Sequence, residues 1–332
     1  MENLARIPHY RRASSHRSNW LLGAVMVTAV AVIPAAAVLA QGGPAPFTVA
    51  ETGQGFGRLQ DAVNAIGAGT GTIAIAPGTY RDCAVQTGGS VAFLATAPGQ
   101  SVFDGGTCEG KAALVLRGRD AKVSGLVFKS MAVPDGNGAG IRLEQGNLTV
   151  TQSWFADSQQ GILTADDPSG RIVIDKSTFS GLGTCEFSGG CAHSIYIGNY
   201  GQLRVTRSRF ERGTGGHYVK TRAARVEIAS SSFDDSAGKA TNYMIDLPAG
   251  SVGQITNNWF VQGRDKENYS AFIAVGAEDN LHSSDGLQIA GNDARLVPNV
   301  RRSTIFVADW TGARLSIADN KLGAGLESFE KR

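Results

Sequence analysis

Apolar and polar residues alternate in short runs along most of this 332-residue chain, and the runs share a recurring ending. The repeat is a small residue, an alternating apolar stretch, Ser or Asn, any residue, and then Phe. It is seen in "GNLTVTQSWF", "GRIVIDKSTF", "GQLRVTRSRF", "ARVEIASSSF" and "GQITNNWF". Weaker copies are "KVSGLVF", "GLQIAGNDA" and "ARLSIADNKL". Alternation with a period of two predicts strands with one buried face.

The residues that end the repeats are separated by 27, 24, 31, 23, 27, 34 and 28 positions. They are Phe128, Phe155, Phe179, Phe210, Phe233, Phe260, Ala294 and Leu322. A period of this size built from strands predicts a β-solenoid, because a single coil cannot bury its apolar face alone. We expect an internal ladder of Phe rings and a polar ladder of Ser and Asn. A seven-stranded sandwich is the alternative, but it predicts hairpin turns about every 8–12 residues and no in-phase repeat.

One segment, residues 55–69, has helical spacing of its apolar residues before glycines end the pattern. These apolar residues are Phe56, Leu59, Ala62, Val63 and Ile66. A strand, "GTIAIAPGTY", follows. This entry and the repeat together resemble the right-handed parallel β-helix superfamily, the pectate-lyase-like fold, over roughly residues 47–325. The resemblance implies an all-β fold of about ten coils with an N-terminal capping helix. It selects no activity, since this fold hosts lyases, glycosidases, esterases, epimerases and passive adhesins.

Residues 1–40 have the order of a secretory signal. Four arginines precede the uncharged stretch "NWLLGAVMVTAVAVIPAAAVLA", and Val38-Leu39-Ala40 forms the expected cleavage site. We therefore predict a signal peptide at 1–40, a β-helix domain at 41–332, and a secreted or periplasmic protein without membrane contact after cleavage. An uncleaved membrane anchor is the alternative, because the apolar run is nearly long enough to span a bilayer.

The charge of the chain changes once this leader is set aside. The leader holds four of the 31 Lys and Arg and one of the 29 Asp and Glu, so residues 41–332 carry 27 basic and 28 acidic residues. A nearly neutral domain predicts no nucleic-acid partner, since that function needs a basic stripe. A local cationic groove remains compatible with this balance.

All four cysteines follow the leader. An even number of cysteines in an oxidising compartment favours disulfides. Cys83–Cys108 and Cys185–Cys191 is the pairing closest in sequence, and it is one of three arrangements. A zinc site or a thiol nucleophile is the alternative, but "CEFSGGC" lacks the C-x-x-C spacing of zinc sites.

Stacked coils place equivalent positions about 4.8 Å apart, so residues distant in the sequence become neighbours in columns. Tyr196, Lys220 and Asp246 each lie 13 or 14 residues before the Phe that ends their repeat. We therefore expect them in one column. His193 and His217 begin adjacent strands at 17 and 16 residues before their Phe, and we expect these two to be neighbours as well.

Side-chain alternation predicts which of these residues face solvent. If Val219 and Thr221 point inward, Lys220 and Arg222 point outward together. The result is an outer wall of acidic, basic and cationic groups, for which an acidic ligand is the natural partner. We assign substrate binding to His193, Asp246 and Glu278.

Such a wall suits β-elimination on a uronic-acid polysaccharide, or C5 epimerisation, which shares the proton-abstraction step. A cation must neutralise the C6 carboxylate, a base must take the C5 proton, and an acid must protonate the leaving oxygen. Lys220 is our first choice of base because cationic neighbours would lower its pKa, and His217 is the alternative base. Tyr196 is the expected acid, and Arg222 the carboxylate clamp. The resemblance supports these roles, since β-helix lyases and epimerases commonly use lysine, arginine, histidine or tyrosine in them.

Two other function classes stay open. A glycoside hydrolase would use two carboxylates, drawn from Asp166, Asp167, Asp234, Asp235 and Asp246. A non-catalytic β-solenoid would bind glycan or space a surface assembly. The candidate residues also have structural alternatives: solvated surface cations, a histidine bonded to a turn carbonyl, and an ordinary strand tyrosine.

The sequence requires no cofactor. "TADDPSG" and "FDDSAG" carry paired carboxylates that could bind calcium, although Asp-rich turns between strands are more often only turns. The expected partner is an acidic polysaccharide, bound by a monomer.

Overall fold

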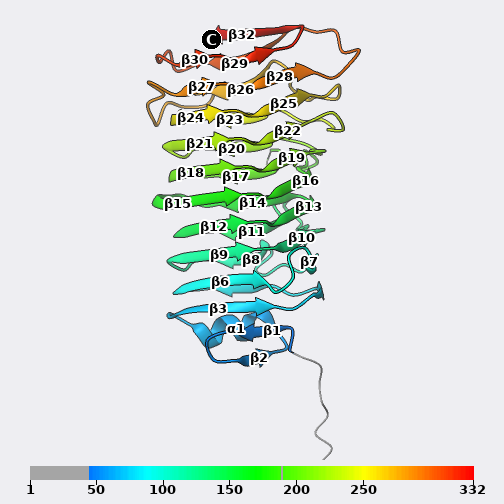
Figure 1. Cartoon of the computed structure of the whole chain (residues 1–332), viewed down its shortest axis with the longest axis vertical. Coiled ribbons are helices and arrows are strands. Elements are labelled where there is room, and N and C mark those ends of the chain that lie inside the picture. Colours follow the sequence, from blue (N-terminus) through cyan, green and yellow to red (C-terminus); the bar gives the residue numbers. More distant parts are fainter. Residues whose placement is uncertain (1–44, 188–189) are drawn as a thin grey trace, which may run out of the picture. The chain divides into compact units, whose positions relative to one another are not determined.

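The chain folds into a parallel β-solenoid, with three sheets that run along its length (Figure 1). The computed structural model describes residues 45–187 and 190–332. The predicted signal peptide at 1–40 therefore lies outside the described residues. Each complete coil adds one strand to each of the three sheets, which we call sheets A, B and C.

Sheet A has twelve strands and sheets B and C have ten each. Sheet A consists of β1 (Phe47–Val49), β2 (Gln54–Phe56), β3 (Thr70–Ile75), β6 (Ser90–Ala95), β9 (Asp120–Ser124), β12 (Asn147–Thr151), β15 (Asp167–Asp175), β18 (Tyr200–Thr206), β21 (Arg225–Ala229), β24 (Val252–Thr256), β27 (Gln288–Ala290) and β30 (Ser316–Ala318). Sheet B consists of β4 (Gly78–Tyr80), β7 (Ser101–Asp104), β10 (Leu126–Lys129), β13 (Trp154–Ser158), β16 (Thr178–Leu182), β19 (Arg209–Glu211), β22 (Ser232–Asp234), β25 (Trp259–Gln262), β28 (Asp293–Leu296) and β31 (Lys321–Leu322). Sheet C consists of β5 (Ala84–Gln86), β8 (Ala112–Leu116), β11 (Ala139–Leu143), β14 (Gln160–Thr164), β17 (Ile195–Ile197), β20 (Val219–Thr221), β23 (Ile245–Leu247), β26 (Ala271–Val275), β29 (Thr304–Asp309) and β32 (Leu326–Lys331). Ten strands in sheets B and C confirm the prediction of about ten coils.

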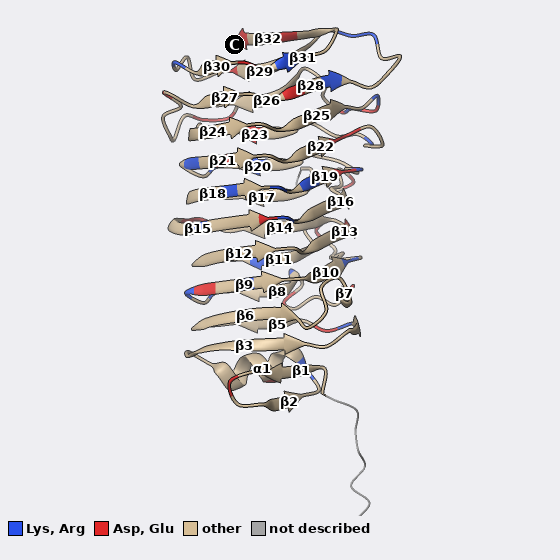
Figure 2. Ribbon diagram, viewed as in Figure 1, with Lys and Arg blue, Asp and Glu red and all other residues tan. Residues whose placement is uncertain are grey.

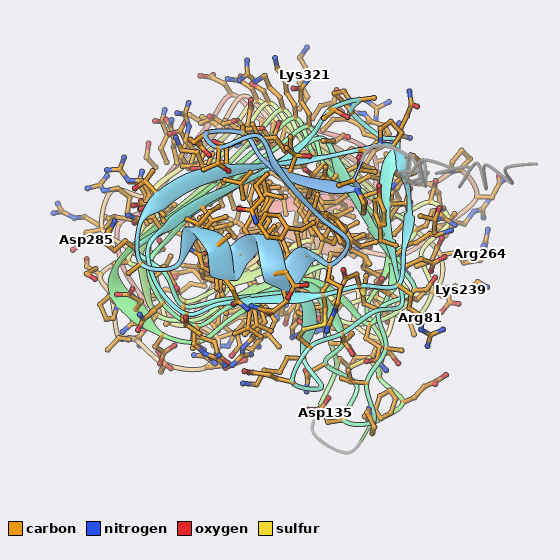
Figure 3. The ribbon with its side chains drawn as sticks, turned by 90° about the horizontal axis from the view of Figure 1, so that it is seen from below. Arg81, Asp135, Lys239, Arg264, Asp285 and Lys321 are labelled. Atoms are coloured by element: carbon orange, nitrogen blue, oxygen red, sulfur yellow. A yellow bond between two sulfur atoms is a disulfide. The ribbon has the colours of Figure 1, made fainter. Side chains whose placement is uncertain are left out.

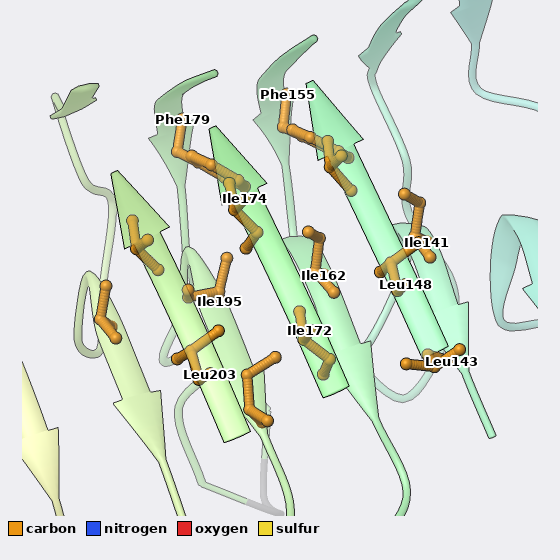
Figure 4. Close-up of a cluster of buried hydrophobic side chains, with 14 of the residues drawn as sticks. Ile141, Leu143, Leu148, Phe155, Ile162, Ile172, Ile174, Phe179, Ile195 and Leu203 are labelled. Atoms are coloured by element: carbon orange, nitrogen blue, oxygen red, sulfur yellow. The ribbon is translucent and has the colours of Figure 1, made fainter. Parts of the chain in front are cut away.

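The Phe that ends each repeat points into the interior, as predicted. Seven rings, from Phe103 to Phe260, stack with centroids 4.8–5.6 Å apart. Ala294 and Leu322 continue this column in strand register. In Figure 4, Phe155 and Phe179 lie on neighbouring coils beside buried Ile and Leu side chains. The ladder begins one coil earlier than the repeat indicated, at Phe103.

The Ser or Asn two residues before each Phe forms the predicted polar ladder. The Oγ of Ser177 accepts the backbone N–H of Ser153 at 3.3 Å, and the same contact recurs on the following coils. Asn258 takes over at the next coil, where its Oδ1 accepts the N–H of Ser231 at 2.9 Å. These side chains are buried, so the ladder satisfies backbone groups where the chain leaves one sheet for the next.

The helix α1 (Leu59–Ile66) covers the first end of the core. Its buried residues Leu59, Ala62 and Val63 belong to the same hydrophobic cluster as the coils. Figure 3, a view along the solenoid, shows α1 lying across the interior. The helix is shorter than the 55–69 segment that suggested it. Phe56 pairs with β1 as part of β2, and Gly67 ends the helix at a positive φ of 59°.

Both predicted disulfides, Cys83–Cys108 and Cys185–Cys191, are formed.

Charged residues lie mainly at strand ends and in loops, with the sheets largely uncharged (Figure 2). No helix among the described residues is long and apolar enough to cross a membrane.

Candidate functional site

The predicted column on sheet C is present. Tyr196 on β17 pairs with Lys220 on β20, and Lys220 pairs with Asp246 on β23. The same column continues in the other direction through Leu163 on β14 to Arg142 on β11. Residues from five coils therefore lie side by side on one outer face.

The alternation within β20 is as predicted. Val219 and Thr221 are fully buried, so Lys220 and Arg222 lie on the outer face. These two side chains are nevertheless only 12% and 22% exposed. The wall is therefore a partly covered site and not a fully solvated surface.

His193 and His217 are neighbours, also as expected. Their ring centroids lie 4.9 Å apart, and the Nδ1 of His193 accepts the backbone N–H of His217 at 3.0 Å. Tyr243 stacks on the other side of His217, with centroids 5.4 Å apart. Burial lowers the pKa of both imidazoles, that of His193 to about 3, so both are neutral at neutral pH.

Asp246 lies beneath this cluster. Its Oδ2 is 3.5 Å from the Nε2 of His217 and 3.4 Å from the Nζ of Lys220. Burial raises the pKa of Asp246 to about 6, against the opposing effect of Lys220. At 2% exposure Asp246 has no direct access to a substrate, so in this conformation it positions Lys220 and His217 and does not bind sugar.

His217 is also poorly placed for its expected role as a base. Its Nδ1 is buried without a hydrogen-bond partner among the described residues, and its Nε2 faces Asp246. Nδ1 therefore does not reach solvent, and the whole side chain is only 10% exposed. The neutral imidazole has the protonation state of a base, but it lacks the access that a base needs.

The segment after β26 covers the two cations. Glu278 places one carboxylate oxygen 2.5 Å from the Nζ of Lys220 and the other against the guanidinium of Arg222. Asp279 accepts a hydrogen bond from Arg222 at 3.0 Å. The backbone N–H groups of Glu278 and Asp279 donate to the carbonyl of Pro248, which holds the segment on the neighbouring coil. Glu278 thus forms ion pairs with the two cations that we expected to bind a substrate carboxylate.

The expected lowering of the Lys220 pKa is wrong. Burial does lower this pKa, but the carboxylates of Asp246 and Glu278 outweigh burial, and the net shift is upward. Lys220 therefore remains protonated at neutral pH. This suits a cation that neutralises a carboxylate better than it suits a base.

Tyr196 has the access that the histidines lack. It lines an open hollow of about 400 Å³ on the outside of sheet C. Its Oη accepts a hydrogen bond from the Nε of Arg222 at 3.2 Å, and the Nζ of Lys220 lies 5.6 Å from its ring centroid. The phenol thus stands between the hollow and the two cations.

The five carboxylates proposed for a hydrolase do not gather at one place. Asp235 is fully buried, 3.2 Å from the Nζ of Lys266, and it also accepts hydrogen bonds from Tyr218 and Thr241. It is a structural residue. Asp234 lies on sheet B, whereas Asp246 lies on sheet C.

The two acidic turns act locally. Asp167 accepts backbone N–H groups from Gly146 and Ser169, and Asp234 accepts that of Ser236. Among residues 45–187 and 190–332, no group of three or more His, Cys, Asp or Glu side chains could hold a metal ion. Calcium binding at these turns stays an untested expectation.

The sequence analysis missed Arg142. It lies 13 residues before Phe155, the same offset that separates Lys220 from Phe233, so the counting that found Lys220 applied to it equally. Tyr243 was also missed, although it lies three residues before Asp246, the same offset that separates His217 from Lys220.

The buried histidines predict a pH effect on stability. His193 has a folded-state pKa of about 3 against an unfolded value of 6.5, so the unfolded chain binds a proton that the folded chain does not. Its contribution to stability is therefore lost as the pH falls from about 6.5 towards 3. In a His193→Asn variant, whose Oδ1 can replace Nδ1 as acceptor, the pH slope of the unfolding free energy between about pH 4 and 6 should fall by about 1 kcal/mol per pH unit. Urea unfolding at several pH values measures this, and an unchanged slope would show that His193 titrates normally.

Comparison with known proteins shows the family to which this fold belongs. A family model described as the right handed beta helix region matches residues 112–312. The alginate lyase from Paenibacillus sp. str. FPU-7 is similar in structure, with a TM-score of 0.57 and 17% identity over 82% of this chain and 94% of that one.

A second similar structure, Geobacillus virus E2 ORF18, has a TM-score of 0.50 and 14% identity over 82% of this chain. The chain spans 57% of the length of that protein. No curated protein matches the sequence. At these identities the structural likeness establishes the fold and leaves the activity to the site. Because the family model covers more than half of the chain, this protein belongs to the right-handed β-helix family.

Proposed function

We propose that this protein is an exported carbohydrate-active enzyme, a polysaccharide lyase or C5-epimerase, that acts on a uronic-acid-containing polysaccharide. The observation that carries the proposal is the position of Tyr196, at the edge of an open hollow with Lys220 and Arg222 directly behind it. An outer face that combines a reachable phenol with two cations is suited to a sugar that carries a carboxylate. The signal-like leader and two disulfides support export.

The reaction needs charge stabilisation and proton transfer, and the site supplies both. Binding of the C6 carboxylate by Lys220 and Arg222 makes the C5 proton more acidic and stabilises the enolate-like intermediate. In elimination, the C5–H electrons form the C4–C5 double bond, the C4–O4 bond breaks, and O4 takes up a proton. In epimerisation, a proton returns to C5 from the other face instead.

Tyr196 is the group we assign to proton transfer. Tyr196 lines the hollow, whereas Lys220 is held in its protonated form and the side chain of His217 is only 10% exposed, with Nδ1 buried and Nε2 beside Asp246. As a phenol, Tyr196 can donate its proton to O4, and as a phenolate it can accept the C5 proton.

Glu278 sets a condition on this mechanism. Its carboxylate is 43% exposed and pairs with both cations, in the way that a uronate carboxylate would. A substrate must therefore displace the segment around Glu278 or share the cations with it. We assign Glu278 to this exchange and not to direct recognition of an anionic sugar.

The experiment that tests the function is a panel of acidic polysaccharides, including alginate, followed by ultraviolet absorbance and by assays for reducing ends. The conjugated double bond of an unsaturated uronate gives an ultraviolet band, so growth of the band is the result expected for a lyase. A changed ratio of C5 epimers without the band identifies an epimerase. Absence of both changes on every uronate polymer contradicts the proposal.

A hydrolase is the second candidate. Asp166 and Asp135 both line the hollow that Tyr196 borders, which keeps two carboxylates near a bound sugar. New reducing ends without the ultraviolet band would support this candidate. Binding without any change in the polymer would support a glycan-binding solenoid.

A further inference from the structure

The hollow beside Tyr196 is lined by Lys111 and Arg142, two cations that have no role in the proposed chemistry. Arg142 lies in the same column as Tyr196, with Leu163 between them. Two strand spacings, about 10 Å, therefore separate the Cα atoms of Arg142 and Tyr196. Both side chains and Leu163 line the hollow.

The guanidinium of Arg142 has spare hydrogen-bonding capacity. Its Nε is buried without a hydrogen-bond partner among the described residues. The nearest carboxylate, Glu144, is 3.8 Å from this nitrogen and already pairs with Lys111 at 2.7 Å and with Arg117 at 2.5 Å. A partly buried guanidinium with unmade hydrogen bonds is costly unless a ligand supplies the acceptors.

Gln160 gives independent evidence of a ligand site. It is 1% exposed, lines the same hollow, and its Oε1 has no partner among the described residues. Its Nε2 donates to Asn137 at 2.7 Å, which holds the amide in place. Buried polar atoms are normally satisfied, so an unpaired donor and an unpaired acceptor on two residues that line one hollow indicate a polar guest.

The remaining lining fits a sugar ring that carries a carboxylate. Leu163 and Tyr196 offer apolar surface to the face of a pyranose, and the carboxylates of Asp135 and Asp166 can accept hydroxyl hydrogens. Asp135 lies in a loop that projects from the body of the solenoid (Figure 3). The guanidinium of Arg142 supplies the planar pair of donors that a carboxylate requires.

We propose that Arg142 binds the carboxylate of a second uronate, two to three sugar residues from the residue that reacts at Tyr196. This inference rests on the proposed function. It adds that the glycan runs along the solenoid axis, across the strands of sheet C, from Lys220 towards Arg142. It also predicts that the enzyme requires a negative charge on the polymer at a distance from the reacting bond.

The test compares Arg142→Met with the wild type on uronate oligosaccharides of increasing length. For long chains the variant should lose about ten- to hundredfold in kcat/KM through KM, the effect of one charge-assisted hydrogen-bonded contact. For disaccharides, which do not reach from Tyr196 to Arg142, kcat/KM should be unchanged. Arg171→Met, an exposed arginine on β15 of sheet A, is the matched control and should behave as wild type.

A binding measurement gives a readout separate from turnover. Titration calorimetry of an uncut uronate polymer into a Tyr196→Phe background should show the same ten- to hundredfold loss when Arg142→Met is added. Equal binding with and without Arg142, in an enzyme that cleaves uronate polymers, overturns the second site alone. A wild type that neither binds nor changes any uronate polymer overturns the proposed function and this inference together.

Discussion

A Tyr196→Phe variant is expected to lose about 10²–10⁴-fold in kcat/KM on the uronate polymer that the wild type attacks, the usual contribution of a positioned general acid or base. The change removes one oxygen and keeps the ring that lines the hollow and faces Lys220. Binding of the polymer should change little, because the carboxylate is held by the two cations. The measurement is steady-state kinetics by the ultraviolet band or by epimer ratio.

Tyr243→Phe is the matched control for this variant. Tyr243 stacks on His217 in the neighbouring row, so its hydroxyl has no part in proton transfer. Lys220→Ala should lower kcat about a hundredfold or more, since it removes a charge that stabilises the intermediate. Lys122→Ala, an exposed lysine on β9 of sheet A, should leave activity unchanged. Full activity in Tyr196→Phe would show that the phenol transfers no proton.

The second large effect is on stability. Lys266→Met is expected to lower the free energy of unfolding by about 3–5 kcal/mol, because it leaves the buried carboxylate of Asp235 without its cation. The Lys266 Nζ also donates to Thr241 and to the carbonyl of Asn242, at 2.8 and 2.5 Å. Both side chains of the ion pair have no exposed surface, so water cannot replace the lost contact.

Chemical denaturation of three variants tests this expectation. Asp235→Asn combined with Lys266→Met should be more stable than Lys266→Met alone, since the neutral amide needs no counter-ion. Lys239→Met, an exposed lysine on the outside of the solenoid in Figure 3, should change the unfolding free energy by no more than about 0.5 kcal/mol. A loss below about 1 kcal/mol for Lys266→Met would mean that the carboxylate finds another partner or a proton.

The fold was predictable because the buried residues of a solenoid recur in the sequence once per coil. Each Phe from Phe128 to Phe260 is in strand register with the next, and the spacing alone identified the column. The same counting placed Tyr196, Lys220 and Asp246 together. It worked because strands in a parallel sheet pair position by position over a fixed spacing.

Burial within the outer face was not predictable in this way. Alternation indicates which side of a sheet a residue faces, but the loops that cover that side have no period. The segment with Glu278 and Asp279 follows β26, yet it lies over Lys220 and Arg222 two coils earlier. Against the effect of burial, Asp246 and the Glu278 of this unforeseen covering together raise the pKa of Lys220, so we assign proton transfer to Tyr196 alone.

The hollow escaped the sequence analysis for a related reason. Asp135 and Asn137 come from a loop, and Arg142, Gln160 and Tyr196 come from three different strands. Besides Tyr196, only Arg142 has a column signal in the sequence. Its neighbour in the column is Leu163, an apolar residue, which hid the connection between Arg142 and Tyr196.

A crystal structure of the Tyr196→Phe variant with a bound uronate oligosaccharide tests the central claim most directly. We expect the chain to lie along sheet C, with one carboxylate on Arg222 and Lys220, the C5 and O4 atoms facing position 196, and Glu278 displaced from the cations. An oligosaccharide bound on sheet A or sheet B, or one whose carboxylates avoid both cations, would contradict the account.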